Sequence, residues 1–199
     1  MRPERSARIR SDLRPLLSAL CVFFVVLLAV ALSKEFTLHI APVAREQGQA
    51  SGLLPVRLVI PAINLDATIE HVGLAADGTM ATPERPDGVA WYELGVRPGQ
   101  IGSAVIDGHS GWKDGRAAAF DALYKLHAGD NIYVEDGMGT TVIFIVREIR
   151  SYEPTADASA VFISHAGGRH LNLITCEGVW DAETKSYSKR LVVFADWEQ

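Results

Sequence analysis

The chain contains 199 residues, of which 48% are apolar and 8% aromatic, and its formal net charge is −5. This length suffices for one well-packed domain with an appendage and excludes two large domains. Residues 1–34 carry six Lys/Arg and two Asp/Glu, a net of +4, so the remaining residues carry −9. That charge indicates no basic nucleic-acid-binding surface on the rest of the chain, and we expect no nucleic-acid partner.

An uncharged apolar run at 16–32 follows a basic tail at 1–15. The run reaches the lower end of the length that spans a bilayer as a helix, roughly 17–25 residues. Five arginines before it predict a cytoplasmic N-terminus and an extracellular remainder. The alternative is a cleaved signal peptide, because Ala29-Val30-Ala31 offers a small-residue cleavage pattern. We favour a single transmembrane anchor, because a signal core has only about 7–15 apolar residues.

Residues 33–53 are mixed, polar and glycine-containing, which is typical of a short stalk, and a domain is expected over 54–199. One helix is expected over 116–126, with Phe120, Leu123 and Leu126 facing the core. Turn residues at 136–139 predict a hairpin. Many short strands with one or two helices predict a mostly β domain, either a small closed barrel or a sandwich. The expected strands cover 56–60, 65–71, 103–107, 131–135, 141–149, 170–176 and 190–195.

Cys176 ends the apolar strand that begins at His170 and is followed by a loop at Gly178. One interpretation is a core-filling cysteine, since unpaired cysteine is among the most buried residue types. The other is a reactive thiol. Cys21 lies inside the apolar run at 16–32 and cannot form a disulfide with Cys176. An unpaired thiol in an exported domain indicates either an intermolecular disulfide or a reactive role.

A cysteine nucleophile needs an acid or base, and an acyl-transfer site also needs a group that stabilises the oxyanion. His109 follows an apolar strand on a bend, which favours a catalytic position over a structural or metal-binding one. His170 is about 20 Å from Cys176 along the same strand and is too distant. Arg190 opens the last strand, whose expected neighbour carries Cys176, so it is the favoured candidate for the cation. The alternatives are Arg147, Arg150 and Arg169.

No zinc-like ligand spacing is present, so neither a metal site nor a cofactor is predicted. Asp107, Asp114 and Asp121 lie near the expected active region, but their spacing is not that of a recognised calcium loop. Calcium dependence is left open by the sequence.

The order of these motifs resembles the sortase family, the cysteine transpeptidases of bacterial surfaces. The resemblance covers about 140 residues and rests on the ordered combination rather than on any one motif. Many members carry Thr-Leu-x-Thr-Cys at the nucleophile, where this chain has Asn172 in place of the first threonine. The motifs are Gly108-His109, Leu173-Ile174-Thr175-Cys176 and Arg190-Leu191-Val192-Val193, with support from Leu58–Pro61, Ile63, Asp66-Ala67, Trp91-Tyr92, Pro98-Gly99, Gly102, Phe120, Leu123, Leu126 and Gly129-Asp130.

The resemblance implies a closed eight-stranded β-barrel in which Cys176, His109 and Arg190 converge on one groove. It implies that Cys176 cleaves the Thr-Gly amide of a Leu-Pro-x-Thr-Gly-like sorting signal and forms a thioacyl intermediate. His109 would act as acid and base, and Arg190 would hold the substrate and the oxyanion. Thr175, Ile174 and Asn172 are the expected substrate-binding residues.

The implied partners are secreted proteins with a C-terminal sorting signal and an amine acceptor such as a peptidoglycan precursor or a pilin. The chain lacks the Asp-Pro-aromatic lid motif of many pilin-building members. Its short stalk and compact domain resemble class F or class D/E sortases of high-GC Gram-positive bacteria. Two alternatives stay open, an exported thiol hydrolase or other wall-peptide cysteine transpeptidase, and a non-catalytic exported β-barrel binding module.

Overall fold

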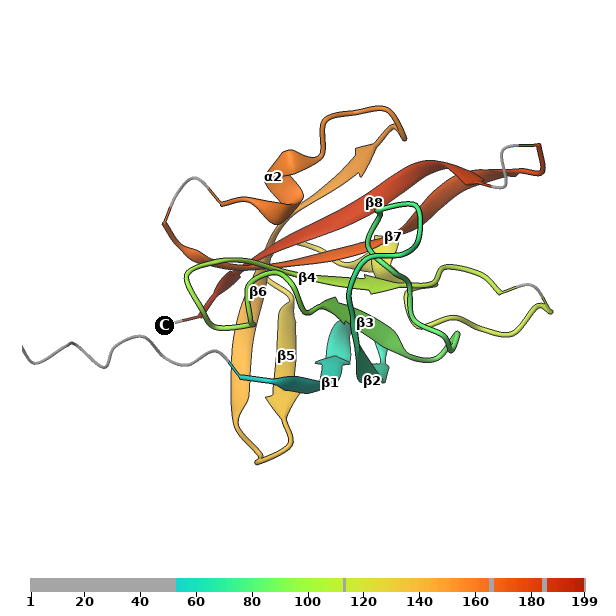
Figure 1. Cartoon of the computed structure of the whole chain (residues 1–199). Coiled ribbons are helices and arrows are strands. Elements are labelled where there is room, and N and C mark those ends of the chain that lie inside the picture. The colour runs from blue at the N-terminus through green and yellow to red at the C-terminus, as the bar shows by residue number, and fades with distance from the viewer. Residues whose placement is uncertain (1–52, 113, 165–166, 184–185, 199) are drawn as a thin grey trace, which may run out of the picture. The chain divides into compact units, whose positions relative to one another are not determined.

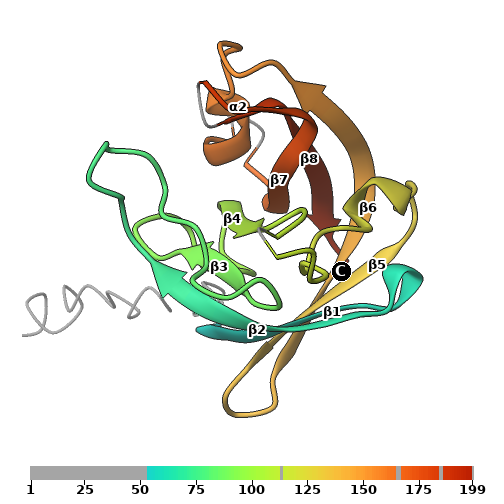
Figure 2. The ribbon, with the colours of Figure 1, turned by 90° about the vertical axis from the view of Figure 1, so that its right-hand side faces the viewer.

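The computed structural model describes residues 53–112, 114–164, 167–183 and 186–198. Within these residues eight strands form a closed barrel, in the order β1-β2-β3-β4-β7-β8-β6-β5 (Figures 1 and 2). Two 3-10 turns, η1 and η2, and one short helix, α2, lie between strands. The elements are β1 (Pro55–Ile60), η1 (Pro61–Ile63), β2 (Leu65–Val72), β3 (Val89–Tyr92), β4 (Gly102–Gly108), η2 (Leu123–Lys125), β5 (Asn131–Asp136), β6 (Thr141–Tyr152), α2 (Ser159–Phe162), β7 (Arg169–Asp181) and β8 (Ser186–Trp197).

Two of the strand pairs are parallel, β2 with β3 and β4 with β7, and the others are antiparallel. A parallel pair needs a long crossover connection. The chain between β4 and β7 therefore includes η2, the β5–β6 hairpin and α2. This crossover brings the end of β4 beside the middle of β7, although the two are far apart in the sequence.

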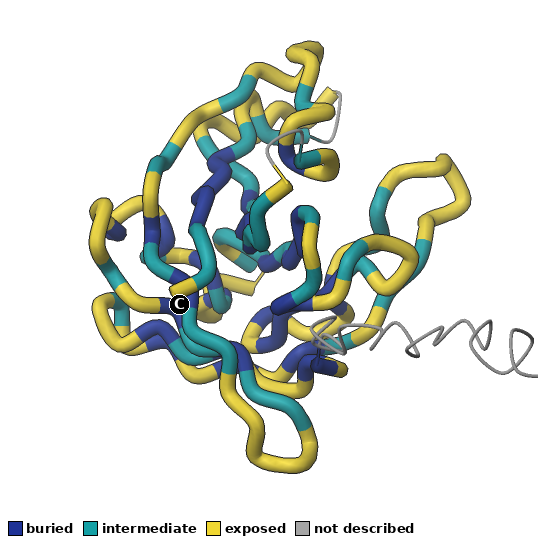
Figure 3. Tube along the Cα trace, turned by 90° about the vertical axis from the view of Figure 1, so that its left-hand side faces the viewer, coloured by how far each residue is buried: buried dark blue, intermediate teal, exposed yellow. Residues whose placement is uncertain are grey.

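The inner faces of the strands form one apolar core. Alternation along the strands places every second residue of β4, β7 and β8 inward. Leu171 and Leu173 of β7 are fully buried, as are Ile106 of β4 and Val193 of β8. Burial of each such side chain stabilises the fold by roughly 1.5–3 kcal/mol. Figure 3 shows buried stretches along the strands and exposed connecting segments.

A second apolar layer lies on the outer face of β4, β7 and β8. Val161 of α2 packs there with Val105, Val192 and Phe194. Asn172 of β7 donates a hydrogen bond from Nδ2 to the Val161 carbonyl oxygen at 2.5 Å. The short helix α2 is therefore fixed against the outside of the sheet, where it borders the cavity described below.

The expected mostly β fold and closed barrel are confirmed, with a strand at each of the seven expected places. The hairpin at 136–139 is confirmed, since β5 pairs with β6 and the Asp136 carboxylate accepts the Met138 and Thr140 amides. Strand β3 was not expected from the sequence. Its four residues are almost all buried, so no polar alternation marks them.

The prediction of a helix over 116–126 is wrong. Only η2 is helical there, and it is a single 3-10 turn. The Asp121 carboxylate accepts the backbone amides of Gly111 and Ala118, and the Phe120 amide bonds to the His109 carbonyl oxygen. These contacts use backbone groups that an α-helix would need. The expected core residues of this segment, Phe120, Leu123 and Leu126, are buried as predicted.

The basic tail at 1–15 and the apolar run at 16–32 lie outside the described residues, as does the stalk at 33–53 apart from Leu53. In the part of the chain that the structure describes, no helix has the length and apolar character needed to cross a bilayer.

Candidate active site

Cys176 lies on the outer face of the barrel, in the middle of β7. Leu171, Leu173 and Thr175 of this strand are buried, so the alternate residues Ile174 and Cys176 point to the other face. Cys176 is half-buried and is a free thiol. It therefore stands on a rigid strand and borders a cavity, rather than filling the core.

Strand register places Arg190 and His109 on either side of Cys176. In the antiparallel pair β7–β8, Cys176 lies directly opposite Arg190. In the parallel pair β4–β7, Asp107 lies opposite Ile174, and His109 follows two residues later, at the level of Cys176. The three side chains line one cavity of ≈ 440 Å³. Its apolar lining includes Met80, Val161, Phe162, Ile174 and Val192.

A backbone carbonyl orients the His109 ring. Nε2 of His109 lies 2.8 Å from the carbonyl oxygen of Pro83, in the segment between β2 and β3. Because a carbonyl oxygen only accepts, this contact favours the tautomer with the proton on Nε2. The Trp112 ring packs edge-on against the imidazole, with centroids 4.8 Å apart. Nδ1 is then the ring nitrogen that can exchange a proton.

Gly108 and Thr175 fix the distance between β4 and β7 beside the site. The buried Thr175 hydroxyl donates to the Gly108 carbonyl oxygen at 2.7 Å. A Cβ at Gly108 would lie only 2.5 Å from Cδ2 of Phe120, so a side chain cannot fit there unless the ring moves. The residue before His109 is therefore glycine because Phe120 packs directly against its backbone.

Arg190 is held by the β7–β8 hairpin. Its Nη1 donates to the carbonyl oxygens of Tyr187 at 3.2 Å and Lys189 at 3.0 Å, and Nη2 lies 3.4 Å from the Ser186 hydroxyl. No carboxylate forms an ion pair with Arg190 among the described residues. Its positive charge is therefore available to a substrate in the cavity.

Burial raises the pKa of the Cys176 thiol, because the thiolate is costly in an environment with little water. The positive charge of Arg190 opposes this effect, and the negative charge of Asp107 adds to it. Burial also raises the pKa of the Asp107 carboxyl, to about 7, although Arg190 and the Gly108 amide favour its ionised form. Besides the thiol, the cavity therefore holds a carboxyl group whose pKa lies near neutral pH.

The other expected substrate-binding residues differ in position. Ile174 lines the cavity with Cys176. Thr175 is 2% exposed and Asn172 is 1% exposed, and their side chains bind the Gly108 and Val161 carbonyls respectively. Neither residue is among those that line the cavity. The structure gives both of them contacts that position neighbouring elements.

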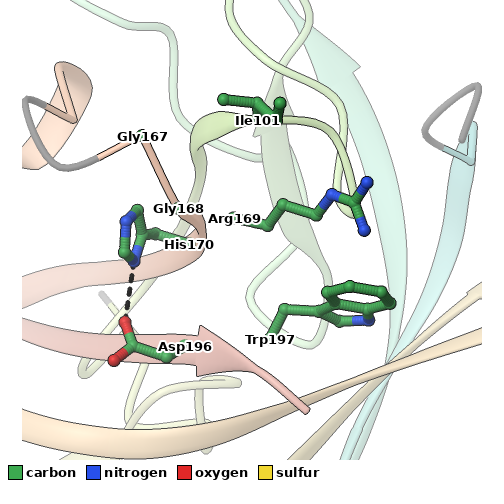
Figure 4. A pocket seen from close by; sticks show the side chains of 7 residues that line it. All are labelled: Ile101, Gly167, Gly168, Arg169, His170, Asp196 and Trp197. Atoms are coloured by element: carbon green, nitrogen blue, oxygen red, sulfur yellow. Dashed lines mark hydrogen bonds and ion pairs between the residues drawn. The ribbon is translucent and has the colours of Figure 1, made fainter. Parts of the chain in front are cut away.

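His170 lies in a different cavity, as its distance along β7 predicts. Its Nδ1 is 2.7 Å from Oδ1 of Asp196, and the Arg169 guanidinium stacks 4.3 Å from the centre of the Trp197 ring (Figure 4). Ser103 is opposite His170 in the β4–β7 register, but no hydrogen bond joins the two among the described residues. No catalytic triad is therefore formed here, although three neighbouring strands place Ser103, His170 and Asp196 opposite one another.

The segment between β2 and β3 supplies lining residues that were not expected from the sequence. Asp77, Thr79, Met80 and Thr82 reach the cavity, and Pro83 supplies the carbonyl that binds His109. The Pro83 contact has no signal in the sequence, because every residue has a backbone carbonyl. Among the described residues, no group of His, Cys, Asp or Glu side chains is arranged to hold a metal ion.

Residues 58–198 match the model of the sortase domain family, and the chain therefore belongs to the sortase family. Sortases are cysteine transpeptidases that act on sorting signals and anchor surface proteins. They are typically membrane-anchored extracellular enzymes. A search of curated proteins gives no significant match.

Solved structures agree with this family. Sortase C-1 of Actinomyces oris is 29% identical, with a TM-score of 0.56 over 73% of this chain and 75% of that one. Sortase C1 of Streptococcus agalactiae, in its complex with MTSET, is 26% identical, with a TM-score of 0.57 over 72% of this chain and 69% of that one. A lid mutant of sortase A from Corynebacterium diphtheriae is 24% identical, with a TM-score of 0.58 over 77% and 74%, and supports the fold alone.

Proposed function

We propose that this sortase cleaves a Leu-Pro-x-Thr-Gly-like sorting signal between Thr and Gly and transfers the threonyl carbonyl to an amine. Cys176 is the nucleophile, His109 the acid and base, and Arg190 the electrostatic stabiliser. The observation that supports this assignment is that the three side chains line one cavity, brought together by the β4–β7 and β7–β8 registers.

In the first half-reaction the Cys176 thiolate attacks the threonyl carbonyl carbon. The carbonyl oxygen becomes an oxyanion, which the Arg190 guanidinium stabilises through charge and hydrogen bonds. The C–N bond to glycine then breaks. The leaving nitrogen takes a proton from Nδ1 of His109, since Nε2 is bound to the Pro83 carbonyl. The products are a thioacyl-enzyme and a free glycine amine.

In the second half-reaction an acceptor amine attacks the thioester carbonyl. His109, now neutral, removes a proton from that amine, and the C–S bond breaks to release the Cys176 thiolate. An amide forms between the threonyl carbonyl and the acceptor. Because burial raises the pKa of Cys176, a minority of molecules carry the thiolate at neutral pH, and Arg190 sustains that fraction.

The cellular setting is part of the proposal. The apolar run at 16–32 serves as a single-pass anchor with the N-terminus in the cytoplasm, residues 33–53 form the stalk, and residues 54–199 form the extracellular catalytic domain. The donors are secreted proteins with a C-terminal sorting signal. The acceptor is a peptidoglycan precursor or a pilin amine, and the subclass follows the resemblance to class F or class D/E.

Intact-mass analysis tests the reaction. The full-length chain in detergent is incubated with Leu-Pro-x-Thr-Gly or Leu-Ala-x-Thr-Gly peptides and an amine, beside Cys176→Ala. We expect an acyl adduct on Cys176, or a Thr-amine product that is absent from the variant. Cleavage without an amine product, even with excess amine, would indicate a hydrolase. The proposal fails if no peptide reacts and no electrophilic probe labels Cys176, an outcome that favours a binding module.

A further inference from the structure

Asp107 lies in the active-site cavity, although the roles described above do not use it. It is the residue of β4 two positions before His109, and its side chain lines the same cavity as Cys176, His109 and Arg190. Its cross-strand neighbour is Ile174, two residues before Cys176 on β7. Asp107 therefore occupies the diagonal position from the thiol, at a spacing of about 8 Å, which follows from the separation of neighbouring strands and the rise of two residues.

The carboxyl group of Asp107 is half-buried and forms no ion pair among the described residues. Ile174 and Val192 form its row of the sheet on β7 and β8, and both are apolar. Arg190, the nearest cation that affects it, instead donates to Tyr187, Lys189 and Ser186 of the hairpin. The Asp107 charge is therefore not neutralised by contact, and it acts on its surroundings through space.

Six other charged or titratable groups face this cavity. Cys176 comes from β7 and Arg190 from β8, while His109 follows β4. β3 places the uncharged Ala90 opposite Asp107. The segments after β2 and at the end of β6 contribute Asp77, Tyr152 and Glu153. Asp77 and Glu153 are both exposed, and Glu153 is paired with Lys189. Of the three carboxylates on the cavity, Asp107 is therefore the one that solvent screens least.

We propose that Asp107 controls the charge at the reactive thiol, its carboxylate offsetting the positive charge of Arg190 and suppressing formation of the Cys176 thiolate. Asp107 thus acts through the Cys176–Arg190 pair and not on the scissile peptide. When Asp107 is protonated, Arg190 stabilises the thiolate without opposition. When Asp107 is ionised, the thiol is held in its less reactive form. The assignment rests on the proposed role of Cys176 as the nucleophile.

The direction of the effect is consistent with the titration of the two groups. Arg190 lowers the pKa of Cys176 and Asp107 raises it, while the pKa of Asp107 itself is raised to about 7 by burial. As the pH rises through neutrality, Asp107 ionises, and ionisation of the thiol becomes harder in the same range. The thiolate fraction therefore increases with pH less steeply than that of an isolated cysteine.

The rate of Cys176 alkylation by iodoacetamide from pH 5.5 to 9 tests this inference without any substrate. It is measured by mass spectrometry of the proteolytic fragment that contains Cys176, because Cys21 is a second thiol in the chain. The full-length chain is compared with Asp107→Asn, which keeps the shape and removes the charge. We expect equal rates below pH 6, where Asp107 is protonated in both proteins. Above pH 7.5 the variant should react about 5-fold faster, as expected for loss of one charge at this spacing in a partly buried site.

Glu153→Gln is the matched control, because it removes one negative charge from an exposed position on the same cavity. Its rate should stay within about 2-fold of the parent at every pH, because solvent screens that charge. A merely structural effect of Asp107→Asn would change the rate equally at all pH values. That result, or an unchanged rate above pH 7.5, would overturn the inference.

The alkylation experiment and the peptide experiment can fail separately. A pH-dependent difference in alkylation together with an absence of thioacyl adduct supports the Asp107 inference and contradicts the proposed reaction. A thioacyl adduct on Cys176 with identical alkylation profiles supports the reaction and contradicts the role of Asp107.

Discussion

Arg190 combines a fixed orientation with an unpaired charge. Its guanidinium donates to two backbone carbonyls and a hydroxyl of the β7–β8 hairpin, so the planar group is oriented before any substrate binds. Such preorganised donors stabilise a developing oxyanion without a reorganisation cost. A lysine supplies the same charge but has neither the planar fork nor several fixed donors.

Arg190→Lys should therefore reduce kcat/KM for the sorting-signal peptide by roughly 100-fold, while unfolding stability stays within about 1 kcal/mol. Steady-state kinetics and urea denaturation measure the two quantities. Arg150→Lys is the control, because Arg150 is exposed on β6 and pairs with Glu148 outside the cavity. Equal kinetics for the two variants would contradict the role of Arg190.

The loop that carries His109 is shaped by contacts from several parts of the chain. Phe120 packs against the backbone of Gly108, Asp121 accepts two loop amides, and Pro83 binds the ring nitrogen. These contacts together hold the loop and the imidazole in a fixed position. A change in the packing of Phe120 is therefore expected to shift the position of His109.

Gly108→Ala should destabilise the protein by about 1–3 kcal/mol and lower activity further, because the new methyl group overlaps Phe120 and displaces His109. Phe120→Leu in the same chain should recover part of both losses, which a double-mutant cycle measures. Gly137→Ala is the control, since its Cβ would meet only Val56 at 4.0 Å. Strictly additive effects of the two core changes would contradict this explanation.

Among the elements, those with clear alternation or turn chemistry were predictable from the sequence. β1, β2, β5 and β6 follow such patterns, whereas β3 is almost wholly buried and has no polar period. The segment at 116–126 has helical spacing, but the Asp121 carboxylate and the Phe120 amide bind distant backbone groups instead. Tertiary contacts of this kind override local propensity.

The sequence predicted Cys176, His109 and Arg190 as site residues because each was expected at a strand end or a turn beside an apolar strand. The structure places Cys176 and Arg190 within β7 and β8 instead, since both strands are longer than expected. The sequence did not indicate which groups affect the pKa of the thiol or the orientation of the imidazole. The proximity of Asp107 to the thiol depends on the parallel register of β4 and β7, and the orientation of His109 depends on the Pro83 carbonyl. The identity of a residue does not show with which distant strand it pairs, or which backbone carbonyl its side chain contacts.

At the scale of the whole molecule, burial of Asp107 affects stability as a function of pH. The pKa of this carboxyl is raised from 3.8 to about 7 in the folded protein, so the folded state holds the proton more tightly than the unfolded chain. Its contribution favours folding fully below pH 4. That contribution is lost as the pH rises toward 7, by an amount on the order of 4 kcal/mol at most.

Asp107→Asn should therefore be more stable than the parent at pH 8, with a difference that shrinks toward pH 4. Urea denaturation at several pH values measures this difference. Asp66→Asn is the contrasting control, because the hydrogen bonds and charge of Arg57 hold the pKa of Asp66 below its ordinary value. Its difference should have the opposite sign. A pH-independent effect of Asp107→Asn would contradict burial of an ionisable carboxyl.

The closed order of the strands also determines when the proposed active site is assembled during folding. The Thr175 hydroxyl and the Gly108 carbonyl that join β7 to β4 are 67 positions apart, and β8, the last strand of the chain, lies between β7 and β6. Contacts between such distant segments form late in folding. In a growing or partly folded chain, Cys176 is therefore not yet next to Arg190 and His109. The arrangement that we propose for catalysis is therefore complete only when the final strand has taken its place.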